Sequence, residues 1–288
     1  MIMHVAEAGE QRGRVVLHIT SGHPSDVAME AAIRIAQAFH SEIESLFVED
    51  LQLYDMASYP FAREISYTGA RSRVLSRDAI ERDLRLAAQA LRRRVEALAL
   101  AANVPLRGAR IVRDDPLQAL AKACAEDGPW NVVALADVLA PGQGARLCEL
   151  FASVSGYTGL MLVGPKARRT RGPVIAVIES PDHLQPMLRA AERMAGVTSG
   201  EVMLMLLSDS PSNGNWLDEQ VRLALGDHAK VRLLHYQIDH GAPAALAEVI
   251  RRLQAGFLIG HFGGILVPAH GDLRDLVAAL ECPLFLMR

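Results

Sequence analysis

Short apolar runs alternate with amphipathic segments along almost the whole chain, and this alternation constrains the fold more than any other feature. The apolar runs of strand length lie at 14–20, 42–48, 108–113, 131–136, 160–164, 173–178, 201–207, 231–238, 256–260 and 283–288. Most of the segments between them carry apolar residues at helical spacing. Strands that alternate with helices predict parallel sheets with right-handed crossovers, and strands that are apolar throughout predict a sheet covered on both faces.

The order of runs is similar before and after a basic stretch at 165–172, which indicates a duplicated unit. The length of 288 residues also fits about two domains. We therefore predict an α/β protein with two tandem Rossmann-like domains, over 1–166 and 172–288. The basic stretch is interpreted as a solvated linker, because its four basic residues are too few to bind nucleic acid in a chain of net charge −3.

The composition limits the classes of function. With 30 basic and 33 acidic residues, the chain has no strong field for nucleic acid or for an anionic membrane. No run approaches the roughly 18 apolar residues of a membrane span, and the start has no signal-peptide pattern, so we expect a cytoplasmic protein. We expect no metal site, because the three cysteines are widely spaced (Cys124, Cys148 and Cys282).

A glycine cluster near the end of the chain is the strongest candidate for a binding site. The stretch GFLIGHFGG, at 256–264, passes from a strand into Gly260, Gly263 and Gly264. Glycines let backbone N–H groups approach phosphate, and the carboxyl ends of parallel strands are where such sheets bind ligands. A glycine turn after a strand also needs no ligand, so both interpretations stay open. The flanking His261 and His270 are interpreted as exposed loop residues.

Three stretches together resemble the universal stress protein family: VVLHITSGHPSDVAMEAAIRIAQAF, DDPLQALAKACAEDGPWNVVALA and LVAALECPLFLM. The resemblance spans nearly the whole chain. It implies a five-stranded parallel sheet of order 3-2-1-4-5 in each half, with the two halves paired within the chain or with chains paired as a homodimer. Many members bind ATP. They use an acidic residue at the end of the first strand and a loop that reads G-x-x-G, nine residues, then G-[S/T].

The first half departs from that ATP-binding pattern at every position. The acidic position falls on Thr20, and the G-x-x-G positions fall on Ala136 and Leu139. The G-[S/T] positions fall on Glu149 and Leu150. A glutamate at the place of a phosphate would repel it. We therefore predict that this half has lost the nucleotide site.

The second half keeps part of the pattern. The acidic position falls on Glu179, which adds a methylene to the usual aspartate, and Gly260 and Gly263 match G-x-x-G. The later pair falls on Leu273 and Arg274, although an arginine can in principle face a phosphate. Any site for ATP or another adenine nucleotide is therefore predicted to be vestigial or altered. Its candidate residues are Glu179, Gly260, Gly263, Gly264 and Arg274.

No group of residues argues for catalytic turnover, so we assign no catalytic residue. The histidines match no metal pattern, and the serines lack the G-x-S-x-G setting of a hydrolase nucleophile. We interpret the chain as a universal stress protein-like regulatory or binding protein of the stress response that needs no cofactor. Two alternatives stay open: an ATP-binding protein with slow ATPase activity in the second half, and a scaffold that binds no small ligand.

One aromatic segment extends the repeat. YDMASYPFAREISY, at 54–67, holds three of the five tyrosines and lies in an insert over 51–76, before a long helix. Aromatic residues dominate protein–protein contacts, so the segment is either a lid or a surface for a protein partner. The alternative is an extra helical turn that packs on its own domain.

Overall fold

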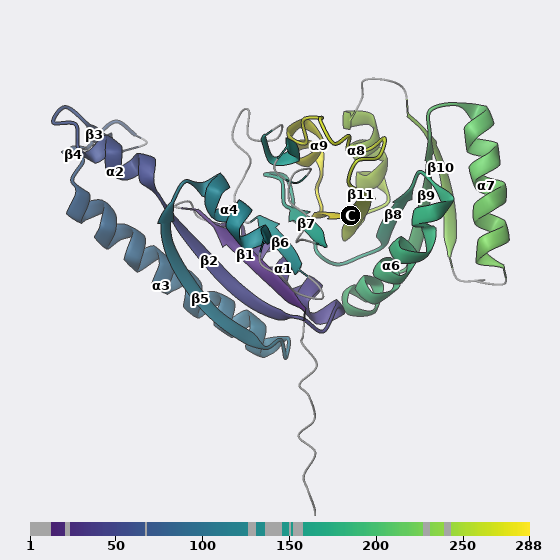
Figure 1. Ribbon diagram of the computed structural model, residues 1–288, viewed down its shortest axis with the longest axis horizontal. Coiled ribbons are helices and arrows are strands. Elements are labelled where there is room, and N and C mark those ends of the chain that lie inside the picture. The colour runs from purple at the N-terminus through teal and green to yellow at the C-terminus, as the bar shows by residue number, and fades with distance from the viewer. Residues whose placement is uncertain are drawn as a thin grey trace, which may run out of the picture.

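The computed structural model describes residues 13–20, 24–66, 68–125, 131–135, 146–149, 151, 158–226, 231–238 and 243–288. A ten-stranded sheet runs through the molecule, and helices cover both of its faces (Figure 1). Every neighbouring pair of strands in this sheet is parallel except one. The prediction of an α/β fold built on parallel strands is therefore confirmed.

The first half supplies five adjacent strands in the order β5-β2-β1-β6-β7. Numbered along the half, this order is 3-2-1-4-5. The elements are β1 (Arg14–Ile19), α1 (Asp26–Ala38), β2 (Glu42–Asp50), α2 (Leu51–Ala57), β3 (Arg63–Ile65), β4 (Ser72–Val74), α3 (Arg77–Ala101), β5 (Leu106–Asp114), α4 (Pro116–Ala125), β6 (Asn131–Leu135) and β7 (Gly159–Leu162). Strands β3 and β4 pair only with each other, in a separate antiparallel ribbon.

The second half repeats the same order, as β10-β9-β8-β11-β12. Its elements are β8 (Val174–Ile178), the 3-10 helix η1 (Pro181–His183), α6 (Leu184–Thr198), β9 (Val202–Ser208), α7 (Pro211–Leu225), β10 (Arg232–Gln237), α8 (Pro243–Arg252), β11 (Phe257–His261), α9 (Arg274–Ala279) and β12 (Leu284–Met287). Among the described residues, no helix is long and apolar enough to cross a bilayer.

The two halves meet edge to edge through their last strands. Strand β12 pairs antiparallel with β7, and Leu284 lies opposite Leu162 while Phe285 lies opposite Met161. The buried Gly159 lets the Phe285 ring lie against the backbone, because a Cβ at 159 would be only 2.7 Å from Cε2 of that ring. The close approach at this glycine therefore helps to join two sheets into one.

The two larger apolar cores, one on each face of the sheet, also join the halves. One core packs α1, α3, α6 and α7 against the sheet, and the other packs α4, α8 and α9. Arg34 on α1 crosses between the halves, because its Nε donates to the Thr170 hydroxyl at 3.1 Å and its Nη1 to the Val197 carbonyl at 3.3 Å. Each of these two cores contains residues of both halves, and the boundaries at 166 and 172 stay a prediction.

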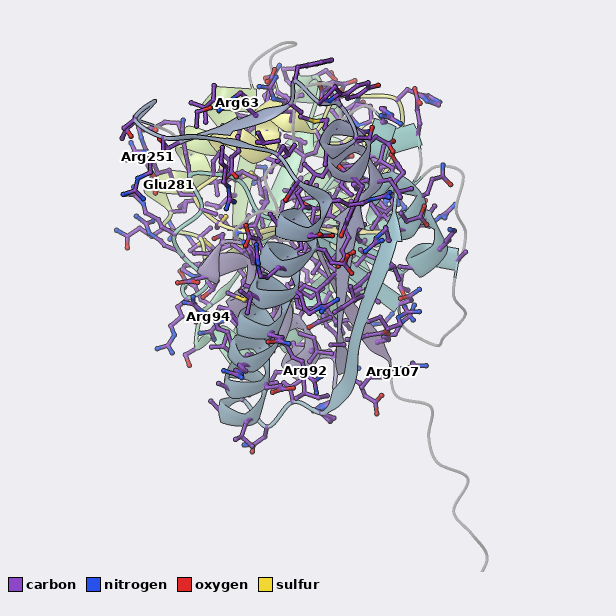
Figure 2. All side chains as sticks on the ribbon, turned by 90° about the vertical axis from the view of Figure 1, so that its left-hand side faces the viewer. Arg63, Arg92, Arg94, Arg107, Arg251 and Glu281 are labelled. Atoms are coloured by element: carbon purple, nitrogen blue, oxygen red, sulfur yellow. The ribbon has the colours of Figure 1, made fainter. Side chains whose placement is uncertain are left out.

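Helix α3 is long and only partly covered. The Ser76 hydroxyl caps it by accepting a hydrogen bond from the Ala79 N–H at 3.2 Å. Only Ala88, Val95 and Ala99 are buried on it. Arg92 and Arg94 lie on this helix (Figure 2), where Arg92 pairs with Glu96 and Arg94 pairs with Asp26 at the start of α1. The exposed face explains how a 25-residue helix can extend past the sheet and carry α2, β3 and β4 at its end (Figure 1).

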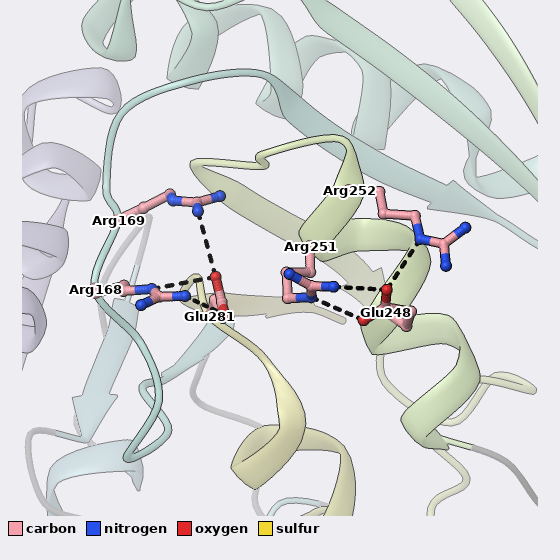
Figure 3. Close-up of polar contacts among 6 residues, drawn as sticks. All are labelled: Arg168, Arg169, Glu248, Arg251, Arg252 and Glu281. Atoms are coloured by element: carbon pink, nitrogen blue, oxygen red, sulfur yellow. Dashed lines mark hydrogen bonds and ion pairs between the residues drawn. The ribbon is translucent and has the colours of Figure 1, made fainter.

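The connection between the halves is held to the second half, so its interpretation as a solvated linker is only partly right. The Arg168 guanidinium makes two hydrogen bonds to the Glu281 carboxylate, at 2.5 and 3.2 Å, and Arg169 lies 3.4 Å from it (Figure 3). Thr170 is buried, whereas Lys166 is exposed. A second carboxylate nearby, Glu248, is shared in the same way by the arginines that end α8 (Figure 3).

Candidate functional site

The predicted acidic residue and the glycine cluster lie side by side at the carboxyl edge of the second half. Strand β8 leads directly into Glu179, and its neighbour β11 ends at His261, just before the glycines. These strands are parallel, so both chain segments leave the sheet at the same edge. This is the place where doubly wound sheets bind ligands.

The Glu179 carboxylate binds the glycine loop itself. One oxygen, Oε2, accepts a hydrogen bond from the Ile265 N–H at 2.5 Å, and Oε1 accepts one from the Leu266 N–H at 2.8 Å. Gly264 makes this approach possible, because a Cβ there would lie 2.0 Å from Oε2. Glutamate has one methylene more than the aspartate of the family pattern. The carboxylate that binds the loop amides therefore stands on a longer side chain.

The two glycines of the G-x-x-G pattern have structural roles. Gly260 is buried in β11, and a Cβ there would lie 3.2 Å from Cδ2 of Leu266, so the glycine makes room for the folded-back loop. Gly263 has a φ of +90°, a conformation that favours glycine, and its N–H donates to the Val267 carbonyl at 2.8 Å. Both glycines therefore shape the turn that brings the loop amides to Glu179.

The downstream positions do not complete a phosphate site. Leu273 is 3% exposed and belongs to the apolar core. Arg274 begins α9 and is exposed, and its backbone N–H donates to the Asp272 carboxylate at 2.9 Å. Its side chain makes no hydrogen bond or ion pair within the part of the chain that the structure describes. The structure therefore brings Glu179 and the glycines together but leaves Arg274 outside this contact.

Two histidines accompany the loop, and the sequence reasoning missed their pairing. The rings of His183 and His261 stack with their centroids 3.7 Å apart and an angle of 15° between their planes. His261 is half-buried, which contradicts its interpretation as an exposed loop residue. The position of His183, four residues after Glu179 and in the turn that follows β8, was the available signal.

The environment shifts the pKa of two groups at this site in opposite directions. Burial raises the pKa of Glu179, and the Leu266 and Ile265 amides and His183 oppose that shift. Burial, together with the neighbouring His183, lowers the pKa of His261. The described residues contain no group of three or more His, Cys, Asp or Glu side chains placed to hold a metal ion.

The corresponding edge of the first half looks different. Thr20 follows β1 and borders a small, mostly apolar recess between the sheet and α3. Its other lining residues are Phe47, Val48, Glu49, Leu84, Ala87, Ala88, Leu91 and Ile111. Of the positions that replace the phosphate loop, Glu149 is exposed, whereas Ala136, Leu139 and Leu150 lie outside the described residues.

Comparisons with known proteins agree on the fold. No protein-family model and no curated protein sequence matches the chain. A universal stress protein from Archaeoglobus fulgidus is similar in structure, with a TM-score of 0.57 and 14% identity over 95% of this chain and 96% of that one. A putative universal stress protein from Pseudomonas aeruginosa gives a TM-score of 0.55 and 15% identity over 96% and 93%. The chain therefore has the fold of the universal stress proteins.

The same fold also occurs in another context. The cytoplasmic domain of a prokaryotic cation chloride cotransporter matches with a TM-score of 0.53 and 9% identity, over 96% of this chain and 95% of that one. Because this architecture occurs both in stress proteins and in part of a transporter, the fold alone assigns no activity.

Proposed function

We propose that the chain is a universal stress protein-like regulatory protein whose nucleotide sites have degenerated. The observation that carries this proposal is the contact between Glu179 and the glycine loop. The Ile265 and Leu266 N–H groups, which would have to face a phosphate, already donate to the Glu179 carboxylate. In this interpretation the second half holds an internal anion in place of a nucleotide.

Electrostatics favour the internal anion over a phosphate. A phosphate that approached the same N–H groups would meet the carboxylate at close range. Two unit charges 4 Å apart repel each other by about 4 kcal/mol at an effective dielectric constant of about 20, which corresponds to roughly a thousandfold in Kd. ATP carries several such charges, so it would bind only if Glu179 left the loop or took up a proton.

The first half supports the same proposal from its residues. Thr20 offers no charge at the end of β1, and an exposed glutamate, Glu149, stands where the G-[S/T] pair would bind phosphate. The recess beside Thr20 is lined mainly by apolar side chains, which give no phosphate oxygen a donor. We infer that neither half turns over nucleotide and that the chain acts through binding other molecules.

Nucleotide analysis tests this proposal directly. The purified protein is denatured, the supernatant is analysed for nucleotide, and ATP binding is measured by calorimetry. We expect no bound nucleotide and no heat of binding for the natural chain. We expect Glu179→Ala to bind ATP or inorganic phosphate measurably, because it frees two loop amides and removes a negative charge.

The control is Glu219→Ala, which removes an exposed glutamate from α7 and leaves the loop unchanged. It should behave like the natural chain. Stoichiometric ATP in the supernatant of the natural protein would contradict the proposal and favour the alternative of an ATP-binding protein with slow ATPase activity. If Glu179→Ala gains no affinity, the carboxylate does not block the site.

A further inference from the structure

The two halves differ most in the crossover that follows their second strand. In the second half, only residues 209 and 210 connect β9 to α7. In the first half, residues 51–76, which we call the insert, connect β2 to α3 and form α2, β3 and β4. The insert lies at one end of the molecule, at the N-terminal end of α3 (Figure 1). The repeat does not need it, since the second half completes the same strand order without it.

The base of the insert is fixed to the sheet. Tyr54 is 1% exposed, and its hydroxyl donates to the Glu49 carboxylate at 2.8 Å. The Arg113 guanidinium lies 4.1 Å from the centre of the Tyr54 ring and donates through Nε to Glu49 at 3.1 Å. This cluster joins α2 to the ends of β2 and β5. A surface that is already held in place loses little conformational freedom when it binds.

The rest of the insert exposes apolar side chains. Tyr59 and Phe61 stand on one turn, closed by the Ala62 N–H, and their rings stack with centroids 5.5 Å apart. These two side chains are 53% and 78% exposed. Thirteen large apolar side chains are exposed in the described residues, and six of them belong to the insert: Leu51, Met56, Tyr59, Phe61, Ile65 and Val74. Such a concentration of exposed apolar side chains is typical of a contact with a protein or a membrane.

The register of β3 and β4 places further apolar side chains on one face of their ribbon. Arg63 lies opposite Val74, and Ile65 lies opposite Ser72. Residues opposite each other share a face, and so do residues two apart on a strand, so these four residues form one face. The Arg63 Nε donates to the Ser72 hydroxyl at 2.8 Å, which agrees with this assignment. Ile65 and Val74 are 66% and 57% exposed on this face.

The other face of the ribbon is turned towards α3. Glu64 and Arg73 lie opposite each other there and form an ion pair. Arg73 also pairs with Asp83 of α3, at 2.9 Å. The acidic residue of the ribbon is therefore neutralised on the covered face, and Asp55, the other acidic residue of the insert, lies on α2. The face with Ile65 and Val74 points away from α3 and carries no acidic residue.

The exposed charges near the apolar side chains are mainly basic. Between Tyr59 and Arg77 the chain has four arginines and one acidic residue, although its net charge is −3 as a whole. Of these arginines, Arg63 and Arg71 are exposed and form no ion pair in the part of the chain that the structure describes. An arginine can lay its methylenes along apolar surface while its guanidinium binds an anion. The local charge therefore complements an anionic surface.

The small size of the ribbon favours a lipid surface over a protein partner. A stable protein complex buries about 800 Å² on each side, from about 20–30 residues. Each strand of this ribbon has three residues, and a ribbon of this kind has no core of its own. A protein partner would need a groove shaped to match it. A bilayer needs no such groove, because its headgroup region accommodates a few apolar side chains wherever they enter.

We propose that the insert docks this chain on an anionic lipid surface. Tyr59, Phe61, Ile65 and Val74 enter the boundary between headgroups and acyl chains, and Arg63 and Arg71 bind lipid phosphates. Few side chains enter, so the contact is peripheral and reversible. The anchored base at Tyr54 transmits the contact to the sheet of the first half. This contact is separate from the glycine loop and goes beyond the function proposed above.

Co-sedimentation of the full chain with vesicles tests the proposal. The probes are vesicles of equal parts phosphatidylglycerol and phosphatidylcholine, and vesicles of phosphatidylcholine alone. We expect the natural chain to bind the anionic vesicles more tightly, and added salt to weaken that binding. Phe61→Ser should weaken it by roughly tenfold or more, because a large apolar side chain is lost from the contact. The matched control is Leu223→Ser, which changes a side chain that is 71% exposed on α7 and should leave binding unchanged.

A second variant measures the contribution of charge. Arg63→Ala should weaken binding to the anionic vesicles by about fivefold, the effect of one arginine near such a surface. Arg189→Ala, which removes an exposed arginine from α6, is its control and should have no effect. Because all four side chains are exposed, circular dichroism should show an unchanged fold in each variant.

Three results would overturn the proposal. The first is a natural chain that stays in the supernatant with anionic vesicles, which would leave the exposed rings to a protein partner. The second is binding that Phe61→Ser does not weaken, which would place the lipid contact outside the insert. The third is equal binding to both kinds of vesicle, which would exclude recognition of anionic lipid. None of these results depends on whether the chain binds a nucleotide, so they leave the proposed function untouched.

Discussion

The two halves share a strand order but differ at the edge where a ligand would bind. In the second half, the Glu179 carboxylate accepts hydrogen bonds from two N–H groups of the glycine loop. In the first half, Thr20 follows the first strand beside an apolar recess, and the insert of residues 51–76 extends the crossover after the second strand. Every residue is buried in β1, the first strand of the first half, and in β8, the first strand of the second half. The comparison teaches that packing preserves the order of buried strands, whereas crossovers and strand ends are free to diverge.

Breaking the junction between the halves should have the largest effect. Gly159→Val would place side-chain atoms against the Phe285 ring, since even a Cβ would lie 2.7 Å from it. We expect the free energy of unfolding to fall by about 3 kcal/mol, as overpacking of a core does, and to be measured by urea denaturation. Gly196→Ala on α6 is the control, because nothing lies within 4 Å of the added Cβ. That change should stabilise the protein by about 0.5–1 kcal/mol. A tolerated valine at 159 would mean that the two halves pack less closely than this junction indicates.

Separating Glu179 from the loop should have a smaller effect that is confined to the second half. Gly264→Ala would place a Cβ 2.0 Å from Oε2, so the carboxylate has to leave the loop amides. We expect a loss of about 2 kcal/mol in the free energy of unfolding, the size of hydrogen bonds to a charged group. Amide hydrogen exchange of Ile265 and Leu266 should become faster.

A double-mutant cycle shows whether this loss arises from the carboxylate. In a Glu179→Ala background, the alanine at 264 has no carboxylate to displace, so Gly264→Ala should cost little further stability. Equal losses in the two backgrounds would place the strain elsewhere in the loop. They would also remove the contrast that we draw between the two halves.

The sequence predicts the fold because the fold depends on periodic burial. Runs such as 173–178 and 201–207 are apolar throughout, and they form inner strands whose order follows from the crossovers. The contact between Glu179 and the Ile265 and Leu266 amides leaves no such pattern. It depends on the path of a loop with irregular geometry, and the only hint was a glutamate in place of an aspartate. The sequence could thus identify the residues of the site without showing that they bind each other.

The aromatic insert shows the same limit. Sequence reasoning left two interpretations open for 54–67, a partner surface or packing on the domain. The structure assigns Tyr54 to the core and leaves Tyr59 and Phe61 exposed, while Tyr67 lies outside the described residues. The choice depends on which tyrosine meets a partner such as Glu49 and Arg113, residues on two different strands. Residue type alone does not contain that information.

The pH dependence of stability should show the smallest effect, and it too belongs to the second half, because Thr20 does not titrate. The folded protein raises the pKa of Glu179. It therefore holds that proton more tightly than the unfolded chain, and this contribution to stability is lost as the pH rises through the folded pKa. The folded protein lowers the pKa of His261, so that contribution is present above the usual histidine range and is lost as the pH falls.

Between neutral and mildly acidic pH, Glu179 and His261 therefore have opposite effects on the free energy of unfolding. Variants that remove one group at a time should separate the two effects. Glu179→Gln removes the group that stabilises the folded protein at acidic pH. The free energy of unfolding should then fall more steeply from pH 7 towards acid than in the natural chain. His261→Asn removes the opposing term, so the same curve should rise or flatten. Urea denaturation across this pH range measures both slopes. If both variants keep the slope of the natural chain, neither group changes protonation on unfolding, and the closed loop of the second half would then differ from the first half in shape but not in charge.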